Sequence, residues 1–147
     1  MSKLVQALLS GMFFTFFLDF FIFLGIKQNY IDFYEIDLYY NILFADNQNI
    51  YIFSLVSIIL GFIITYVNST KISIITISFL AILSLSTLIP TIGYTLGKNM
   101  FMSEGTTLKN DKFIYNGDIY YSGREEITFY DYELKKIILL DKRELKQ

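Results

Sequence analysis

The sequence contains no cysteine, no histidine and no tryptophan, and its only proline is Pro90. Without cysteine the chain forms no disulfide and carries no thiolate nucleophile. Without histidine it lacks the usual general base at neutral pH and the commonest protein ligand of metal ions. No glycine-rich phosphate loop and no metal-ligand spacing is present either. We therefore expect no catalytic residue, no metal site and no cofactor.

Charge is also sparse in this chain. Charged residues make up 18% of the 147 residues, and the formal net charge is −2. No basic cluster is present that could follow a phosphate backbone, so nucleic acid is not an expected partner. Apolar residues make up 54% of the chain and are concentrated before residue 97. This distribution is typical of an integral membrane protein rather than of a soluble domain.

Three long apolar runs, at residues 4–26, 50–67 and 72–96, predict three transmembrane helices within a bundle of residues 1–97. A helix rises about 1.5 Å per residue, and the hydrocarbon core of a bilayer is about 30 Å thick. The second and third runs are separated only by residues 68–71, which predicts an antiparallel helical hairpin. The first run ends without the small residues of a cleavage site, so we expect a retained helix rather than a signal peptide.

A stripe of small and polar residues follows the first predicted helix. Gly11, Thr15 and Asp19 recur at intervals of four residues and therefore share one face. The other faces are rich in phenylalanine, leucine and isoleucine, which suit lipid, so the stripe is expected to face protein. An aspartate near the centre of a span costs about 2.5–3.5 kcal/mol. Three interpretations of Asp19 stay open: a protonated group hydrogen-bonded to a serine or threonine, a partner for a basic group on another subunit, and an ion or proton site.

Small and hydroxyl-bearing residues form further stripes on the second and third predicted helices. We expect these stripes to face each other or the stripe of the first helix, held by close packing and interhelical hydrogen bonds. A polar conduit is the alternative. The predicted helix-packing residues are Ser54, Ser57, Gly61, Thr65, Ser84, Thr87 and Thr91, and the stripe of the second helix ends at Asn68.

Pro90 predicts a kink in the third helix, because it cannot donate the amide hydrogen bond to the Ser86 carbonyl. The hydroxyls of Ser86 and Thr87 are expected to satisfy the freed carbonyl groups.

The segment 28–49 is polar but rich in tyrosine and phenylalanine. Ile31, Tyr34, Leu38 and Ile42 recur at helical spacing, which predicts a short amphipathic helix in the membrane interface. The alternative is a docking surface for a partner, because exposed aromatic residues favour protein interfaces.

Charged residues return in the segment 98–147, which predicts a small antiparallel β-meander of three or four strands outside the bilayer. Strands are expected near 112–115, 118–121, 127–130 and 136–140, with a type I′ turn at Asn116-Gly117 and a further turn at Ser122-Gly123. A domain this small rarely folds alone. It is therefore expected to pack on segment 28–49, on a second copy or on another protein, and its open edge can accept a strand from a partner.

The few lysines that flank the apolar runs favour a cytoplasmic amino terminus and an extracytoplasmic, periplasmic tail. We therefore expect a multi-pass protein of a bacterial cytoplasmic (inner) membrane, surrounded by lipid. Its expected function is that of a non-catalytic accessory, assembly or scaffold subunit, which contacts other membrane-protein subunits or copies of itself through the tail and segment 28–49. The alternatives are an oligomer that translocates ions or protons through Asp19, and a membrane immunity or exclusion protein.

Overall fold

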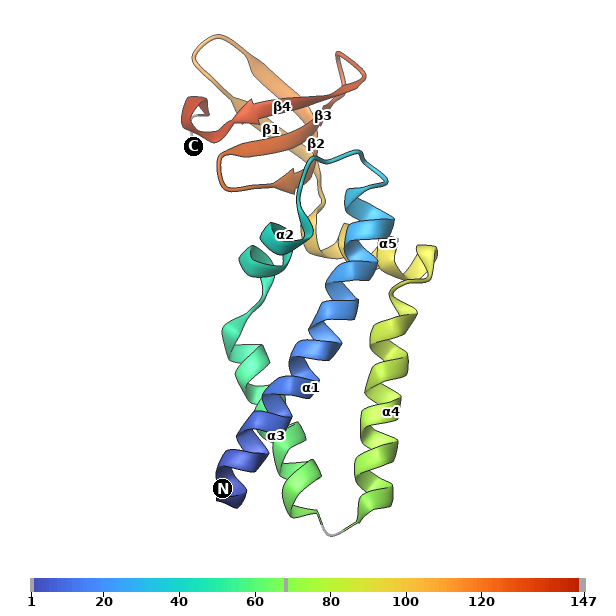
Figure 1. Ribbon diagram of the computed structural model, residues 1–147. Helices are drawn as coiled ribbons and strands as arrows, with labels where there is room; N and C mark the ends of the chain where they lie inside the picture. Colours follow the sequence, from blue (N-terminus) through green and yellow to red (C-terminus); the bar gives the residue numbers. More distant parts are fainter. Residues whose placement is uncertain (1, 68, 146–147) are drawn as a thin grey trace.

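The computed structural model describes residues 2–67 and 69–145. Within these ranges the chain forms five α-helices followed by a four-stranded antiparallel sheet. Figure 1 shows the three long helices side by side as a stalk, with the sheet beyond the end that is opposite the amino terminus.

One continuous helix in the described part of the chain is long and apolar enough to cross a membrane by itself. This is α1 (Lys3–Ile26), which a π-helical turn extends over Lys27–Ile31. It begins after Ser2, whose hydroxyl accepts a hydrogen bond from the Val5 amide. The predicted span at residues 4–26 therefore has the length and composition that crossing a bilayer requires.

The other two long helices, α3 (Ile50–Tyr66) and α4 (Thr70–Ser86), have 17 residues each. A helix of that length rises only about 26 Å. α3 is long enough for a span only together with the short helix α2 (Tyr40–Asn47), from which it is bent by 84°. In the same way α4 is long enough only together with α5 (Pro90–Phe101), and this pair is bent by 83°. The crossing of the membrane by α3 and α4 therefore stays a prediction.

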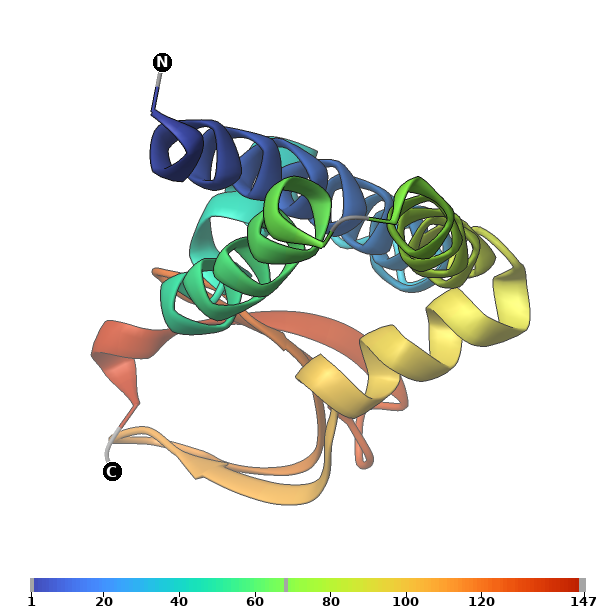
Figure 2. The same ribbon diagram turned by 90° about the horizontal axis from the view of Figure 1, so that it is seen from below.

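The third predicted helix, residues 72–96, is not continuous. The chain leaves the helical path after Ser86, and Pro90 begins α5 in a direction 83° away. The expectation of a kink within one helix was therefore wrong, because the helix is broken. At the first position of α5 the missing amide hydrogen of Pro90 costs no hydrogen bond. Figure 2, which looks along the stalk, shows α4 nearly end-on and α5 running across that direction toward the sheet.

The amphipathic helix predicted from Ile31 to Ile42 is also absent from the described residues. Residues 32–39 form turns and extended chain, and α2 begins only at Tyr40. Glu35 has a φ of 53°, which an α-helix does not permit. The apolar spacing of this segment reflects contacts with neighbouring elements rather than one helical face.

Small residues set the contact between α1 and α3. A Cβ atom at Gly11 would lie 1.9 Å from the Ser57 carbonyl oxygen, and one at Gly61 would lie 2.1 Å from the Ala7 carbonyl oxygen. The stripe of α3 therefore faces the stripe of α1, while α3 and α4 make few contacts with each other.

The hydroxyl groups on the predicted stripes behave differently from one another. The buried Thr15 and Ser57 hydroxyls, and that of Thr65, have no hydrogen-bond partner within the described residues, so the expected interhelical bonds are missing there. Thr87 and Ser73 do bond across helices, to the carbonyl oxygens of Phe21 and Ile63. Ser84 is buried but donates within its own helix, to the Ala81 carbonyl. Ser54 and Thr91 are exposed, and Asn68 lies outside the described residues.

The sheet confirms the predicted antiparallel meander, with four strands in chain order. They are β1 (Ser103–Lys109), β2 (Ile114–Ser122), β3 (Glu126–Asp131) and β4 (Lys136–Asp141). One face of the sheet closes over a small core of Ile127, Phe129 and Leu140. The composition change after residue 97 falls within α5, which continues to Phe101.

The first part of the sheet differs from the prediction. Asn116-Gly117 is not a turn but lies inside β2, and β1 was not foreseen. A Cβ atom at Gly117 would lie 1.8 Å from the Tyr130 carbonyl oxygen, so close approach of the backbone explains this glycine. The turn between β1 and β2 forms instead at Asn110, whose side chain accepts a hydrogen bond from the Phe113 amide.

Candidate docking groove

Aromatic side chains attach the sheet to the helices. Tyr30 is fully buried, and its hydroxyl donates a hydrogen bond of 2.8 Å to the Tyr120 carbonyl of β2. The rings of Tyr34 and Tyr120 lie 4.0 Å apart, and the Tyr34 hydroxyl is 2.7 Å from that of Tyr94 in α5. Burial and this hydrogen bond raise the pKa of Tyr34, which favours the neutral hydroxyl that takes part in the bond. Of the three expected ways of covering the sheet, packing on segment 28–49 is the one observed.

The break before α5 is stabilised by a residue that the sequence did not single out. The Asn29 amide donates hydrogen bonds of 3.1 and 3.3 Å to the carbonyl oxygens of Thr87 and Leu88. The Ser86 carbonyl accepts a bond from the Ile89 amide instead. The Ser86 and Thr87 hydroxyls do satisfy carbonyl groups in the last turn of α4, because they donate hydrogen bonds of 2.7 Å to the carbonyl oxygens of Leu83 and Ser84. Asn29 and the backbone satisfy the carbonyl groups that follow.

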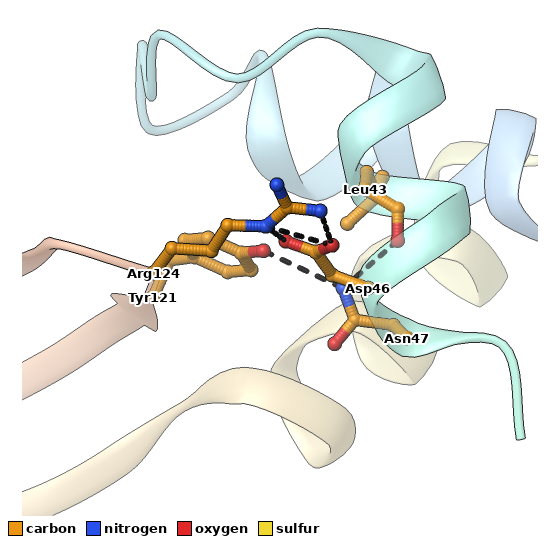
Figure 3. Close-up of polar contacts among 5 residues, drawn as sticks. All are labelled: Leu43, Asp46, Asn47, Tyr121 and Arg124. Atoms are coloured by element: carbon orange, nitrogen blue, oxygen red, sulfur yellow. Dashed lines mark hydrogen bonds and ion pairs between the residues drawn. The ribbon is translucent and has the colours of Figure 1, made fainter.

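An ion pair fixes α2 to the sheet (Figure 3). Arg124, in the turn between β2 and β3, binds both carboxylate oxygens of Asp46, with its Nε 2.8 Å from Oδ2. Beside this pair the Asn47 amide donates to the Leu43 carbonyl at 2.8 Å and to the Tyr121 hydroxyl at 3.4 Å. The hydrogen bonds from Arg124 lower the pKa of Asp46, which favours the charged carboxylate of this pair.

Between residues 34–46 and the sheet lies an open groove of about 640 Å³. This volume is within the range of roughly 300–1,000 Å³ that is usual for ligand pockets. Two lining residues belong to β4: Ile137 is 43% exposed and Leu139 is 65% exposed. On the opposite side the apolar lining consists of Ile36, Leu38 and Ile42. We call this feature the docking groove.

Acidic side chains dominate the charged part of the docking groove. Its carboxylates are Glu35, Asp37, Asp46, Glu125 and Glu126, and its one basic side chain is Arg124. Asp46 is paired with Arg124, whereas the other four carboxylates form no ion pair with any described residue. No cluster of three or more potential metal ligands occurs in the part of the chain that the structure describes.

The predicted site residues lie away from the docking groove. The Asp19 carboxylate accepts a hydrogen bond of 2.9 Å from the side chain of Gln48, which connects α2 to α3. Of the three interpretations of Asp19, the hydrogen-bonded packing role is the one for which the described residues supply a partner. That partner is the side-chain amide of Gln48 rather than the expected serine or threonine. Gly11 lies in the contact between α1 and α3, and Thr15, one turn further along α1, is buried.

The residues that sequence reasoning missed had only weak signals. Gln48 and Asn49 stand just before a long apolar run, a usual place for residues that end or cap a helix. Asn49 does cap α3, since its side chain accepts hydrogen bonds from the amides of Tyr51 and Ile52. The pairing of Arg124 with Asp46 joins positions 78 residues apart and has no local signature.

Comparison of the chain with protein-family models, with curated proteins and with solved structures gave no match.

Proposed function

We propose that this chain is a membrane-anchored, non-catalytic accessory subunit that holds a partner protein in the docking groove. One observation carries the proposal. The tail and segment 28–49, which the sequence marks as the two contact regions, lie against each other and line a single groove. Ile137 and Leu139 leave apolar surface exposed there. A partner that removed this surface from water would gain binding free energy.

In this proposal α3 and α4 cross the membrane beside α1. Their outward faces expose large apolar side chains, which include Ile52, Leu55, Ile58, Phe62, Ile74, Ile75, Phe79 and Ile82. Soluble monomers rarely expose contiguous apolar patches above about 300–600 Å². Seventeen residues is the lower end of the length of a spanning helix, about 17–25 residues, and local thinning of the bilayer accommodates a short span.

Three crossings place the docking groove on the side of the membrane opposite the amino terminus. The lysines near the helix ends favour the amino terminus in the cytoplasm of a bacterial cell and the groove outside it. A partner would then meet the groove next to the bilayer surface, because the stalk ends directly below the sheet (Figure 1).

Site-specific photo-crosslinking in the native membrane tests this function. A photoreactive amino acid replaces Leu139 in the groove or, as the matched control, Leu134 in the turn before β4; these leucines are 65% and 55% exposed. We expect one discrete adduct with a second membrane-extracted protein from position 139, and none from position 134. The adduct should disappear when Ile137→Asp is added. No adduct at position 139, or the same adducts at both positions, would contradict the proposal.

A further inference from the structure

We infer that the occupant of the docking groove is an extended, apolar segment of another protein, flanked by lysine or arginine residues. This inference rests on the proposed function and adds the chemistry of the partner to it. Two features of the groove carry it, its charge and the free edge of β4.

The charge of the groove favours a cationic partner. Five carboxylates against one guanidinium give the lining a formal charge of −4, while the whole chain carries only −2. The carboxylates come from both sides, with Glu35 and Asp37 before α2, Glu125 in the turn between β2 and β3, and Glu126 at the start of β3. Basic residues on either side of an apolar segment would meet complementary charge there. An acidic segment, an anionic lipid headgroup or a nucleic acid would be repelled.

The geometry of β4 favours an extended partner. Among the described residues β4 pairs only with β3, so its other edge has no strand beside it. Such an edge offers backbone amide and carbonyl groups to an added strand. Along β4, Ile138 and Leu140 pack on the core of the sheet, whereas the alternating Ile137 and Leu139 face the groove. Apolar side chains of an added strand would extend this exposed apolar surface.

Synthetic peptides test the inference on the full chain in phosphatidylcholine nanodiscs, with empty nanodiscs as the background. The probes are fluorescent octapeptides with a central Val-Leu-Val-Leu flanked by two lysines at each end, the same centre flanked by glutamates, and a Ser-Thr-Ser-Thr centre flanked by lysines. We expect the lysine-flanked apolar peptide to bind at least tenfold more tightly than the other two. Its affinity should fall as the salt concentration rises.

Charge variants localise that binding to the groove. Glu35→Gln combined with Glu126→Gln should weaken the lysine-flanked peptide about tenfold. The matched control, Glu133→Gln with Glu144→Gln, removes two exposed carboxylates that do not line the groove and should leave affinity unchanged. Equal weakening by both double variants would place the peptide elsewhere and overturn the inference.

Other outcomes separate this inference from the proposed function. Equal binding of the glutamate-flanked peptide would overturn the inference. If no peptide binds but the specific crosslink at Leu139 still forms, the inference is overturned and the proposed function stays intact. A concentration-dependent dimer that Leu139→Ser abolishes would assign the groove to a second copy of the chain and likewise overturn the inference.

Discussion

Single glycines decide how closely α1 and α3 approach each other. At Gly11 and Gly61 an added Cβ atom would lie within 2.1 Å of a carbonyl oxygen of the facing helix. The nearby hydroxyls of Thr15 and Ser57 form no hydrogen bond within the described residues, so close backbone packing rather than hydrogen bonding holds this contact. This mode of association is usual where lipid removes the hydrophobic driving force between helices.

Gly61→Val is therefore expected to lower stability. The added side chain forces the helices apart, and overpacking of this kind costs about 1–3 kcal/mol. The measurement is thermal or denaturant unfolding in detergent micelles. Ser54→Val serves as the control, because Ser54 is on the same helix but exposed. Equal destabilisation by the two substitutions would show that the contact is not where the structure places it.

The ion pair between Asp46 and Arg124, which attaches α2 to the sheet outside the proposed spans, makes the stability of the fold depend on pH. Arg124 lowers the pKa of Asp46 in the folded chain. The ion pair therefore contributes fully above the unfolded pKa of an aspartate, about 3.9, and its contribution is lost as pH falls through the lowered folded pKa.

Asp46→Asn should accordingly lower the unfolding midpoint at pH 6, by an amount that shrinks as the pH is taken below about 4. Glu133→Gln, which changes an exposed carboxylate without an ion pair among the described residues, should show no such trend. An effect of Asp46→Asn that is independent of pH would mean that the charge of the pair does not matter.

At the scale of elements, the long helix α1 was predictable because an apolar run of more than twenty residues with a single charge, Asp19, has few alternatives to a spanning helix. The prediction of a turn at Asn116-Gly117 was wrong because a glycine also fits a strand where another backbone approaches closely. Gly117 is such a glycine, since the Tyr130 backbone lies against it. The break before α5 was predicted only as a kink, since its size depends on Asn29, which lies 61 residues before Pro90 in the sequence.

Asn29→Leu should destabilise the bend between α4 and α5. It leaves the carbonyl oxygens of Thr87 and Leu88 without the partner seen in the structure, at a cost of about 1–3 kcal/mol for an unsatisfied buried group. Distances between spin labels on α4 and α5 should broaden, and the unfolding midpoint should fall. Asn99→Leu, an exposed change on α5, should do neither. An unchanged distance distribution in Asn29→Leu would contradict this role.

At the scale of the whole molecule, the docking groove was beyond prediction from the sequence. It exists because the sheet is fixed onto the helices by pairs such as Tyr30 with Tyr120 and Arg124 with Asp46, which are 90 and 78 residues apart. The sequence did indicate that the sheet needed cover and that two segments were suited to contacts. Which cover it received depends on tertiary packing alone.

The membrane arrangement proposed for this chain depends on α3 and α4 crossing the bilayer, and one residue tests this most directly. Ser69 lies in the turn between these two helices, and the absence of native cysteine makes a single Ser69→Cys label unambiguous. The measurement is labelling of intact cells with a membrane-impermeant maleimide, with Ser2→Cys and Glu133→Cys as references. Three crossings predict that position 69 behaves like position 2 and opposite to position 133. Labelling of positions 69 and 133 from the same side would mean that only α1 spans the membrane.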